Sequence, residues 1–120
     1  MTPLTITSRD AATGPVLEIT GDLDYTSAPE LRQLLDQLTL MAGQQLVLDL
    51  TGLAFCDSSG ISALLAARSR AMEQDATVAL AAVPANTARI LRIVGLDRVF
   101  ALYPDAAAAV ARASVTDLTA

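Results

Sequence analysis

The sequence FCDSSG, residues 55–60, separates two apolar patterns of different period. Before it, residues 46–50 (LVLDL) are nearly all apolar, as is typical of a strand buried on both faces. After it, residues 59–73 repeat apolar side chains at the spacing of a helix. The side chains expected on the inner face of this helix are Ile61, Leu64, Leu65 and Met72. In an open α/β sheet, such a strand–helix junction is where ligands and partners bind.

Asp57 and Ser58 stand where this helix begins, and two roles are open to them. A side-chain oxygen at this position accepts a hydrogen bond from a free backbone N–H group and so caps the helix. A serine there can also carry a phosphate, because the free N–H groups and the helix dipole favour an anion. The two roles are compatible, and these residues alone do not choose between them.

Patterns along the whole chain predict an alternation of strands and helices. Strands are expected at residues 4–8, 16–20, 46–50, 77–83 and 99–102. Helices are expected to begin near Ser27, Ser59, Asn86 and Asp105. Ser27 is three residues ahead of Glu30, the spacing of a capping box, and Asn86 is expected to cap the third helix. That third helix is expected to bury Ala88, Leu91 and Val94.

The order β-β-α-β-α-β-α-β-α predicts a single α/β domain over residues 1–113. Its sheet is expected to be mixed and largely parallel, with about five strands and about four helices, because strand–helix–strand units require parallel pairing. Residues 114–120 are expected to form a frayed tail.

Two features of the helix at residues 59–73 bear on function. Arg68 falls on the predicted inner face, where its stem would lie along the edge of the core with the charge in water. The outer face is expected to begin with Ser62, Ala63 and Ala66. Such small side chains would let another protein approach closely, although a chain this rich in alanine can also carry them without a function.

Composition disfavours several kinds of partner. Aromatic residues make up 3% of the 120 residues, the net charge is −5, and there is no basic run, which argues against nucleic acid. No apolar stretch approaches the roughly 18 residues of a membrane span, so no membrane partner is expected. The N-terminus lacks the features of a secretory signal, so a cytoplasmic location is expected.

Composition also disfavours catalysis and metal binding. The chain has no histidine and no lysine, and its one cysteine is Cys56. A disulfide within the chain and a zinc site of histidine and cysteine are therefore excluded. A serine nucleophile such as Ser58 would lack its usual base, which disfavours a hydrolase, and no enzyme is expected. A glycine-rich phosphate loop is absent, which disfavours nucleotide binding, and no cofactor is expected.

Three motifs together resemble the anti-sigma factor antagonists, the stand-alone members of the STAS domain family. They are GDLD at residues 21–24, DSSG at residues 57–60 and VGLDRVF at residues 94–100. The resemblance covers nearly the whole chain and implies a partner switch. In that family the antagonist binds an anti-sigma factor that is also an ATP-dependent serine kinase, and so frees the sigma factor. The kinase then phosphorylates the first serine of the DSSG motif, the phosphoprotein is released, and a PP2C-type phosphatase restores it.

The resemblance assigns the phosphorylation site to Ser58. It also implies a set of switch and partner-binding residues around this serine, namely Asp22, Asp24, Asp57, Ser59, Gly60, Ser62 and Ala63. Gly60 is expected to leave room for the kinase or the phosphate. Cys56 stands where the family usually has a larger apolar side chain, and it is expected to be buried and inert.

A second interpretation uses the same fold. STAS domains also serve as non-catalytic subunits of lipid-transport ABC complexes and of stress-sensing assemblies, and the intact DSSG motif only mildly disfavours these roles. The sequence names neither the sigma factor nor the signal, and it leaves the oligomeric state open.

Overall fold

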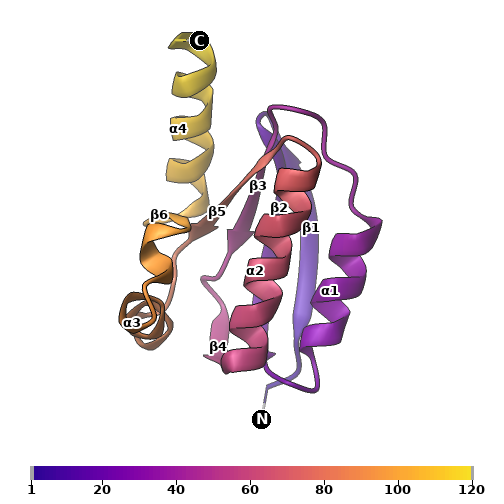
Figure 1. The fold of residues 1–120 in the computed structure, drawn as a ribbon, viewed down its shortest axis with the longest axis vertical. Coiled ribbons are helices and arrows are strands. Elements are labelled where there is room, and N and C mark those ends of the chain that lie inside the picture. The colour runs from indigo at the N-terminus through magenta and orange to yellow at the C-terminus, as the bar shows by residue number, and fades with distance from the viewer. Residues whose placement is uncertain (1, 120) are drawn as a thin grey trace.

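A mixed sheet of six strands forms the centre of this computed structural model, which describes residues 2–119, with side chains to residue 113 (Figure 1). In chain order the elements are β1 (Thr5–Ala11), β2 (Gly14–Leu23), α1 (Ala28–Gln37), β3 (Gln45–Asp49), β4 (Leu53–Cys56), α2 (Ser58–Glu73), β5 (Thr77–Ala81), α3 (Ala85–Ile93), the 3₁₀ helix η1 (Leu96–Arg98), β6 (Ala101–Tyr103) and α4 (Ala106–Thr119). The predicted mixed, largely parallel α/β architecture is confirmed.

The sheet runs in the order β1-β2-β3-β5-β6, and all pairs except the β1–β2 hairpin are parallel. One strand was missing from the sequence prediction. β4 pairs in parallel with the end of β2, beyond the part of β2 that pairs with β3. It is only four residues long, and its two central residues, Ala54 and Phe55, are exposed, so it lacks the apolar pattern of a buried strand.

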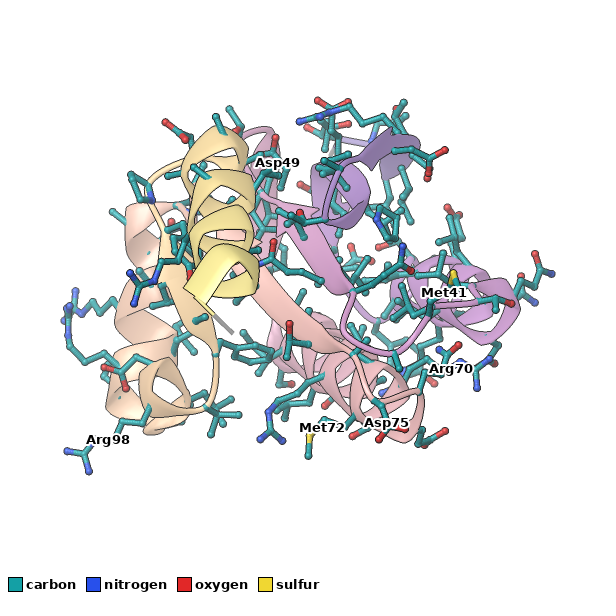
Figure 2. The ribbon with its side chains drawn as sticks, turned by 90° about the horizontal axis from the view of Figure 1, so that it is seen from above. Met41, Asp49, Arg70, Met72, Asp75 and Arg98 are labelled. Atoms are coloured by element: carbon teal, nitrogen blue, oxygen red, sulfur yellow. The ribbon has the colours of Figure 1, made fainter. Side chains whose placement is uncertain are left out.

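Helices cover both faces of the sheet. Neighbouring residues along each strand point to opposite faces. The parallel register aligns them into two rows across the sheet, Leu17–Leu48–Leu80 and Val16–Val47–Ala79. The leucine row belongs to the larger core, which also contains the buried side chains of α1 and α2. The other row packs against Ala106 and Ala109 of α4, so α4 lies across the sheet from α2 (Figure 2).

The predicted phase of α2 is partly wrong. The buried residues of this helix are Gly60, Ile61, Ala63, Leu64, Ala67 and Ala71. Met72 was expected inside but is 55% exposed, and Ala63 was expected outside but is fully buried. Leu65 and Arg68 are half-buried at the margin of the face. Small side chains line the inner face of α2. They therefore allow close packing against the protein's own core and not against another protein.

Helix starts also differ from the prediction at two positions. Ser27 precedes α1 as expected, but its side chain makes no capping hydrogen bond there, so the predicted capping box does not form. α3 begins at Ala85 after Pro84, which places Asn86 inside the helix and not at its cap. Val94, predicted to be buried, follows α3 and is 57% exposed.

α4 continues beyond the predicted domain boundary at residue 113. The side chains of the predicted frayed tail, residues 114–120, lie outside the described residues, and this boundary stays a prediction. Within residues 2–119, no helix combines the length and the apolar character needed to cross a bilayer.

Candidate functional site

The candidate site lies at the edge of the sheet where β2 and β4 both end. The two strands are parallel, and each leads directly into a helix, α1 or α2. This arrangement brings Asp22, near the end of β2, and Asp24, in the loop after it, next to the loop with Asp57 and Ser58. The carboxyl end of a parallel sheet is the usual place for ligand and partner sites, because loops of several strands meet there. The ends of the GDLD and DSSG motifs therefore form one surface.

Asp57 connects the two loops and caps α2. One oxygen of its carboxylate, Oδ1, accepts a hydrogen bond of 3.0 Å from the backbone N–H of Gly60. The other, Oδ2, accepts one of 3.2 Å from the backbone N–H of Tyr25 in the loop before α1. The backbone N–H of Asp57 in turn donates to the carbonyl of Leu23 at 3.3 Å. Asp57 thus fixes the start of α2 against the end of β2.

Ser58 is the first residue of α2, and it is exposed, while Ser59 is half-buried. Because Asp57 supplies the cap, the hydroxyl of Ser58 is not needed for it. Within residues 2–113, neither serine side chain makes a hydrogen bond. Of the two roles open to this pair, capping therefore belongs to Asp57, and Ser58 is exposed beside it.

Asp24 organises its own loop. Its Oδ1 accepts hydrogen bonds from the backbone N–H groups of Thr26 and Ser27, at 3.1 and 3.0 Å. The hydroxyl of Ser27 lies 3.1 Å from the same oxygen and donates to the carbonyl of Asp22 at 2.7 Å. The Asp24 carboxylate therefore holds the loop before α1, and no hydrogen bond joins it to the DSSG loop within the described residues.

Asp22 is directed towards the N-terminal segment. Its Oδ2 accepts a hydrogen bond of 3.1 Å from the backbone N–H of Thr2, and its own N–H donates to the Thr2 carbonyl at 3.0 Å. Asp22 is half-buried, and its contacts are structural ones to the segment before β1.

Gly60 and Ala63 are not surface residues, contrary to expectation. A Cβ atom at Gly60 would lie 2.5 Å from the carbonyl oxygen of Leu23 and 2.6 Å from Sγ of Cys56. The glycine is therefore required by close packing of α2 on the end of β2, and the expected room for a kinase or a phosphate stays a prediction. Ala63 is 0% exposed, so it cannot present a surface to a partner in this conformation. Ser62, one position earlier, is exposed as predicted.

Two residues beside the site were missed by the sequence prediction. Tyr25 is 82% exposed, although its backbone is fixed by the hydrogen bond to Asp57. Arg32 of α1 is exposed and makes no ion pair within residues 2–113. Together with Ser59 and Ser62 they line a groove of about 290 Å³ between the first turns of α1 and α2. An aromatic residue directly after GDLD, in a chain with 3% aromatics, was the available signal.

Cys56 is buried, as predicted. Burial raises the pKa of its thiol from 9.0 to about 12, and the neighbouring negative charge of Asp57 adds to this shift. The side chain therefore remains a protonated thiol at neutral pH and is not a nucleophile in the folded protein.

Comparison with known proteins finds relatives that match most of the chain. The family model described as "Mlab, STAS domain" matches residues 6–104. The anti-sigma-F factor antagonist RsfB of Mycobacterium tuberculosis (strain CDC 1551 / Oshkosh) is 30% identical over 100 residues, which are 83% of this chain and 81% of RsfB.

Solved structures give the same result. An anti-sigma factor antagonist from Mycobacterium paratuberculosis superposes with a TM-score of 0.82 and 26% identity, covering 93% of this chain and 95% of the other. An anti-sigma-factor antagonist (STAS) domain protein from Planctomyces limnophilus superposes with a TM-score of 0.79 over 91% and 97% of the two chains. Its identity of 20% shows the fold alone. Because the family model and the relative RsfB both span most of the chain, this protein belongs to the STAS domain family.

Proposed function

We propose that this protein is an anti-sigma factor antagonist controlled by phosphorylation of Ser58. In its unphosphorylated form it binds an anti-sigma factor that is also an ATP-dependent serine kinase, and so frees the sigma factor. Phosphorylation releases the antagonist from the anti-sigma factor, and a PP2C-type phosphatase removes the phosphate and so restores the binding form. The chain acts in the cytoplasm by binding alone and catalyses nothing.

The observation that carries the proposal is the free hydroxyl of Ser58 at the first position of α2. It is exposed and makes no hydrogen bond within residues 2–113, while Asp57 performs the capping. A kinase can therefore reach Ser58 without displacing a structural contact. The names of RsfB and of the Mycobacterium paratuberculosis protein give independent support for the class of partner.

Charge explains why phosphorylation would release the partner. A phosphate adds about −1.5 to −2 charges next to the Asp57 carboxylate. Burial of such a cluster in an interface is unfavourable without matching cations. In the free protein the N-terminus of α2 partly stabilises the phosphate, because the helix dipole and free N–H groups favour an anion there. The fold thus tolerates a modification that the complex does not.

The test measures phosphate transfer and binding with each purified anti-sigma factor kinase encoded in the same genome. Ser58→Ala should accept no label from radioactive ATP and should bind the kinase persistently. Ser59→Ala is the matched control, and it should still be labelled, because the side chain of Ser59 makes no hydrogen bond within residues 2–113. If Ser58→Ala is still labelled and Ser59→Ala is not, the phosphorylation site is Ser59 and not Ser58. Equal affinity of the unphosphorylated and phosphorylated proteins would reject the switch.

A transporter subunit is the competing outcome. If purification of Ser58→Ala from its native host recovers a transporter ATPase and no anti-sigma factor, the chain is an accessory STAS subunit instead.

A further inference from the structure

Five of the nine large apolar side chains that are exposed within residues 2–113 lie on the surface formed by α3, η1 and β6. We call it the α3 face. Its exposed apolar residues are Ile90, Ile93, Val94, Val99 and Leu102. Within α3 itself only Thr87 and Leu91 are buried, so most of this helix faces away from the core. A concentration of exposed apolar side chains in one part of a surface is typical of a binding site.

The α3 face is also basic. Arg89, Arg92 and Arg98 are exposed on it, and its acidic residue is Asp97. None of the three arginines makes an ion pair or side-chain hydrogen bond within residues 2–113. The face is therefore positive although the net charge of the chain is −5. Exposed apolar side chains with arginines around them are typical of the energetically important part of a protein interface.

The charge selects the kind of partner. The complementary surface has an apolar centre with carboxylates at its edge. A symmetric contact between two copies of this chain would place the arginines of one α3 face against those of the other, which is electrostatically unfavourable. The occupant is therefore a different, acidic protein surface and not a second copy.

The position of the face relates it to Ser58. β5 is parallel to β3, and β3 is parallel to β2, so α3 begins at the same edge of the sheet as α1 and α2. Figure 1 shows α3 at the end of the molecule where β4 leads into α2, whereas α4 extends towards the opposite end. A partner that covers Ser58 can therefore extend over the α3 face.

We propose that the anti-sigma factor binds the α3 face as a second contact, through an apolar surface edged by carboxylates. This proposal rests on the function proposed above and names a part of the partner's surface. The α3 face lies outside the DSSG loop, so phosphorylation of Ser58 leaves it intact. The phosphorylated protein consequently retains a weak affinity that falls as the salt concentration rises.

The experiment compares three variants that alter exposed residues. Ile93→Ser removes an apolar side chain that is 72% exposed, and Arg92→Glu reverses a charge on the same face. Met41→Ser is the matched control, because Met41 is 71% exposed and lies far from Arg98 across the molecule (Figure 2). Ile93→Ser and Arg92→Glu should each weaken binding of the anti-sigma factor kinase at least about tenfold. Met41→Ser should bind as the unmodified protein does.

Other outcomes reject the inference in distinguishable ways. If binding depends on Ser58 but Ile93→Ser and Arg92→Glu behave like Met41→Ser, the proposed function stands and the second contact is wrong. If no kinase binds the unmodified protein, the proposed function fails and the second contact fails with it. Concentration-dependent dimerisation in sedimentation that Ile93→Ser abolishes would assign the face to a second copy. Binding to phosphatidylglycerol vesicles that Arg92→Glu abolishes would assign it to a membrane surface.

Discussion

Gly60 is the residue at which α2 comes closest to the end of β2. A methyl group there would meet the Leu23 carbonyl and Sγ of Cys56 at 2.5 and 2.6 Å. Gly60→Ala should therefore destabilise the protein by about 1–3 kcal/mol through overpacking. The loss should occur although alanine is the better helix former by about 1 kcal/mol. Urea denaturation measures it, with Ser59→Ala as the control for helix propensity. Unchanged or increased stability of Gly60→Ala would contradict the observed packing of α2 on β2.

Cys56 provides a test of burial beside the switch. Burial raises the pKa of its thiol from 9.0 to about 12, with the charge of Asp57 as a second cause. At pH 8.5 the thiolate fraction in the folded protein is about 1000-fold lower than in the unfolded chain. Iodoacetamide should therefore modify the native protein at least about 100-fold more slowly than the protein in urea. Rapid alkylation of the native protein, followed by mass spectrometry, would show that the site opens.

The same shift has a consequence for stability. The pKa of the Cys56 thiol is raised on folding, so its protonated form is favoured in the native state. The contribution to stability is fully present below pH 9 and is lost as the pH rises from 9 towards 12. The free energy of unfolding, measured by urea denaturation between pH 9 and 12, should therefore change less with pH in Cys56→Ala than in the unmodified protein.

Of the three helix caps predicted from the sequence, the one at the start of α2 is confirmed and those at Ser27 and Asn86 are wrong, while the residues that act through packing could not be predicted at all. A cap depends on its own helix start, so the position of Asp57 sufficed to suggest its role, which the hydrogen bond to Gly60 confirms. The roles expected of Gly60 and Ala63 depended on which surface packs against α2. Small side chains suit a docking partner and a close-packed core equally well, and the sequence pattern does not distinguish the two.

At the scale of the element, the phase of α2 makes a paired prediction. Leu64 is fully buried, whereas Met72 is 55% exposed although the sequence pattern placed both on one face. Leu64→Ala should cost about 2–5 kcal/mol, as for other buried leucines. Met72→Ala should change stability by less than about 0.5 kcal/mol, because surface substitutions usually do. Urea denaturation of the two variants in parallel decides between the observed phase and the predicted one.

Arg70 of α2 holds the C-terminal end of α1. Its Nε donates to the carbonyl of Leu35 at 3.3 Å, and its guanidinium also donates to the carbonyls of Asp36 and Leu38 at 3.2 and 3.4 Å. These are carbonyls of the last turn and C-cap of α1, where a positive charge is favourable. Arg70 thus joins the two helices that border the groove at Ser59 and Ser62.

Arg70→Ala should therefore destabilise the protein by about 1–2 kcal/mol, because charged hydrogen bonds to the end of α1 are lost. Arg68→Ala is the control, since Arg68 makes no hydrogen bond or ion pair within the described residues. Hydrogen exchange should also quicken at the end of α1 in Arg70→Ala. Equal stability of the two variants would mean that the contacts of Arg70 do not hold in solution.

The elements that sequence patterns failed to place share a physical cause. β4 is short and its central residues are exposed, so its existence depends on the free end of β2 and not on its own apolar content. The sequence pattern singled out Arg68, because it fell on the predicted inner face of the helix. The arginine that links two elements is Arg70, two positions later. Its partners are backbone carbonyls some 35 residues away, and no side-chain pattern encodes such contacts.

At the scale of the whole molecule, charge is distributed unevenly. Asp22, near the end of β2, and Asp24 and Asp57, in the loops after β2 and β4, lie at the edge of the sheet where α2 begins. The arginines of the α3 face make no ion pair within residues 2–113. A partner that covers both regions would meet negative and positive surfaces on one side of this protein. The proposed phosphorylation of Ser58 would add negative charge to the first region only. The expected response to phosphorylation is thus a loss of one of two contacts, while the domain itself remains folded.

The stability of Ser58→Asp tests this separation of folding from binding. The new carboxylate lies beside Asp57, which repels it, but it also lies at the first position of α2, where the helix dipole stabilises a negative charge. Ser58 is exposed, and its side chain makes no hydrogen bond within residues 2–113 that the change would break. The free energy of unfolding should therefore stay within about 0.5 kcal/mol of the unmodified value.

Binding should respond differently, because an interface would have to cover the added charge. Aspartate supplies about one negative charge against up to two for phosphate, so Ser58→Asp should weaken binding of the anti-sigma factor less than phosphorylation does. Urea denaturation and affinity measured on the same preparation separate the two effects. If Ser58→Asp unfolds at a markedly lower urea concentration than the unmodified protein, weaker binding would reflect a damaged fold. Unchanged stability together with reduced affinity would locate the effect of the charge in the interface itself, because the free domain accommodates it at the start of α2.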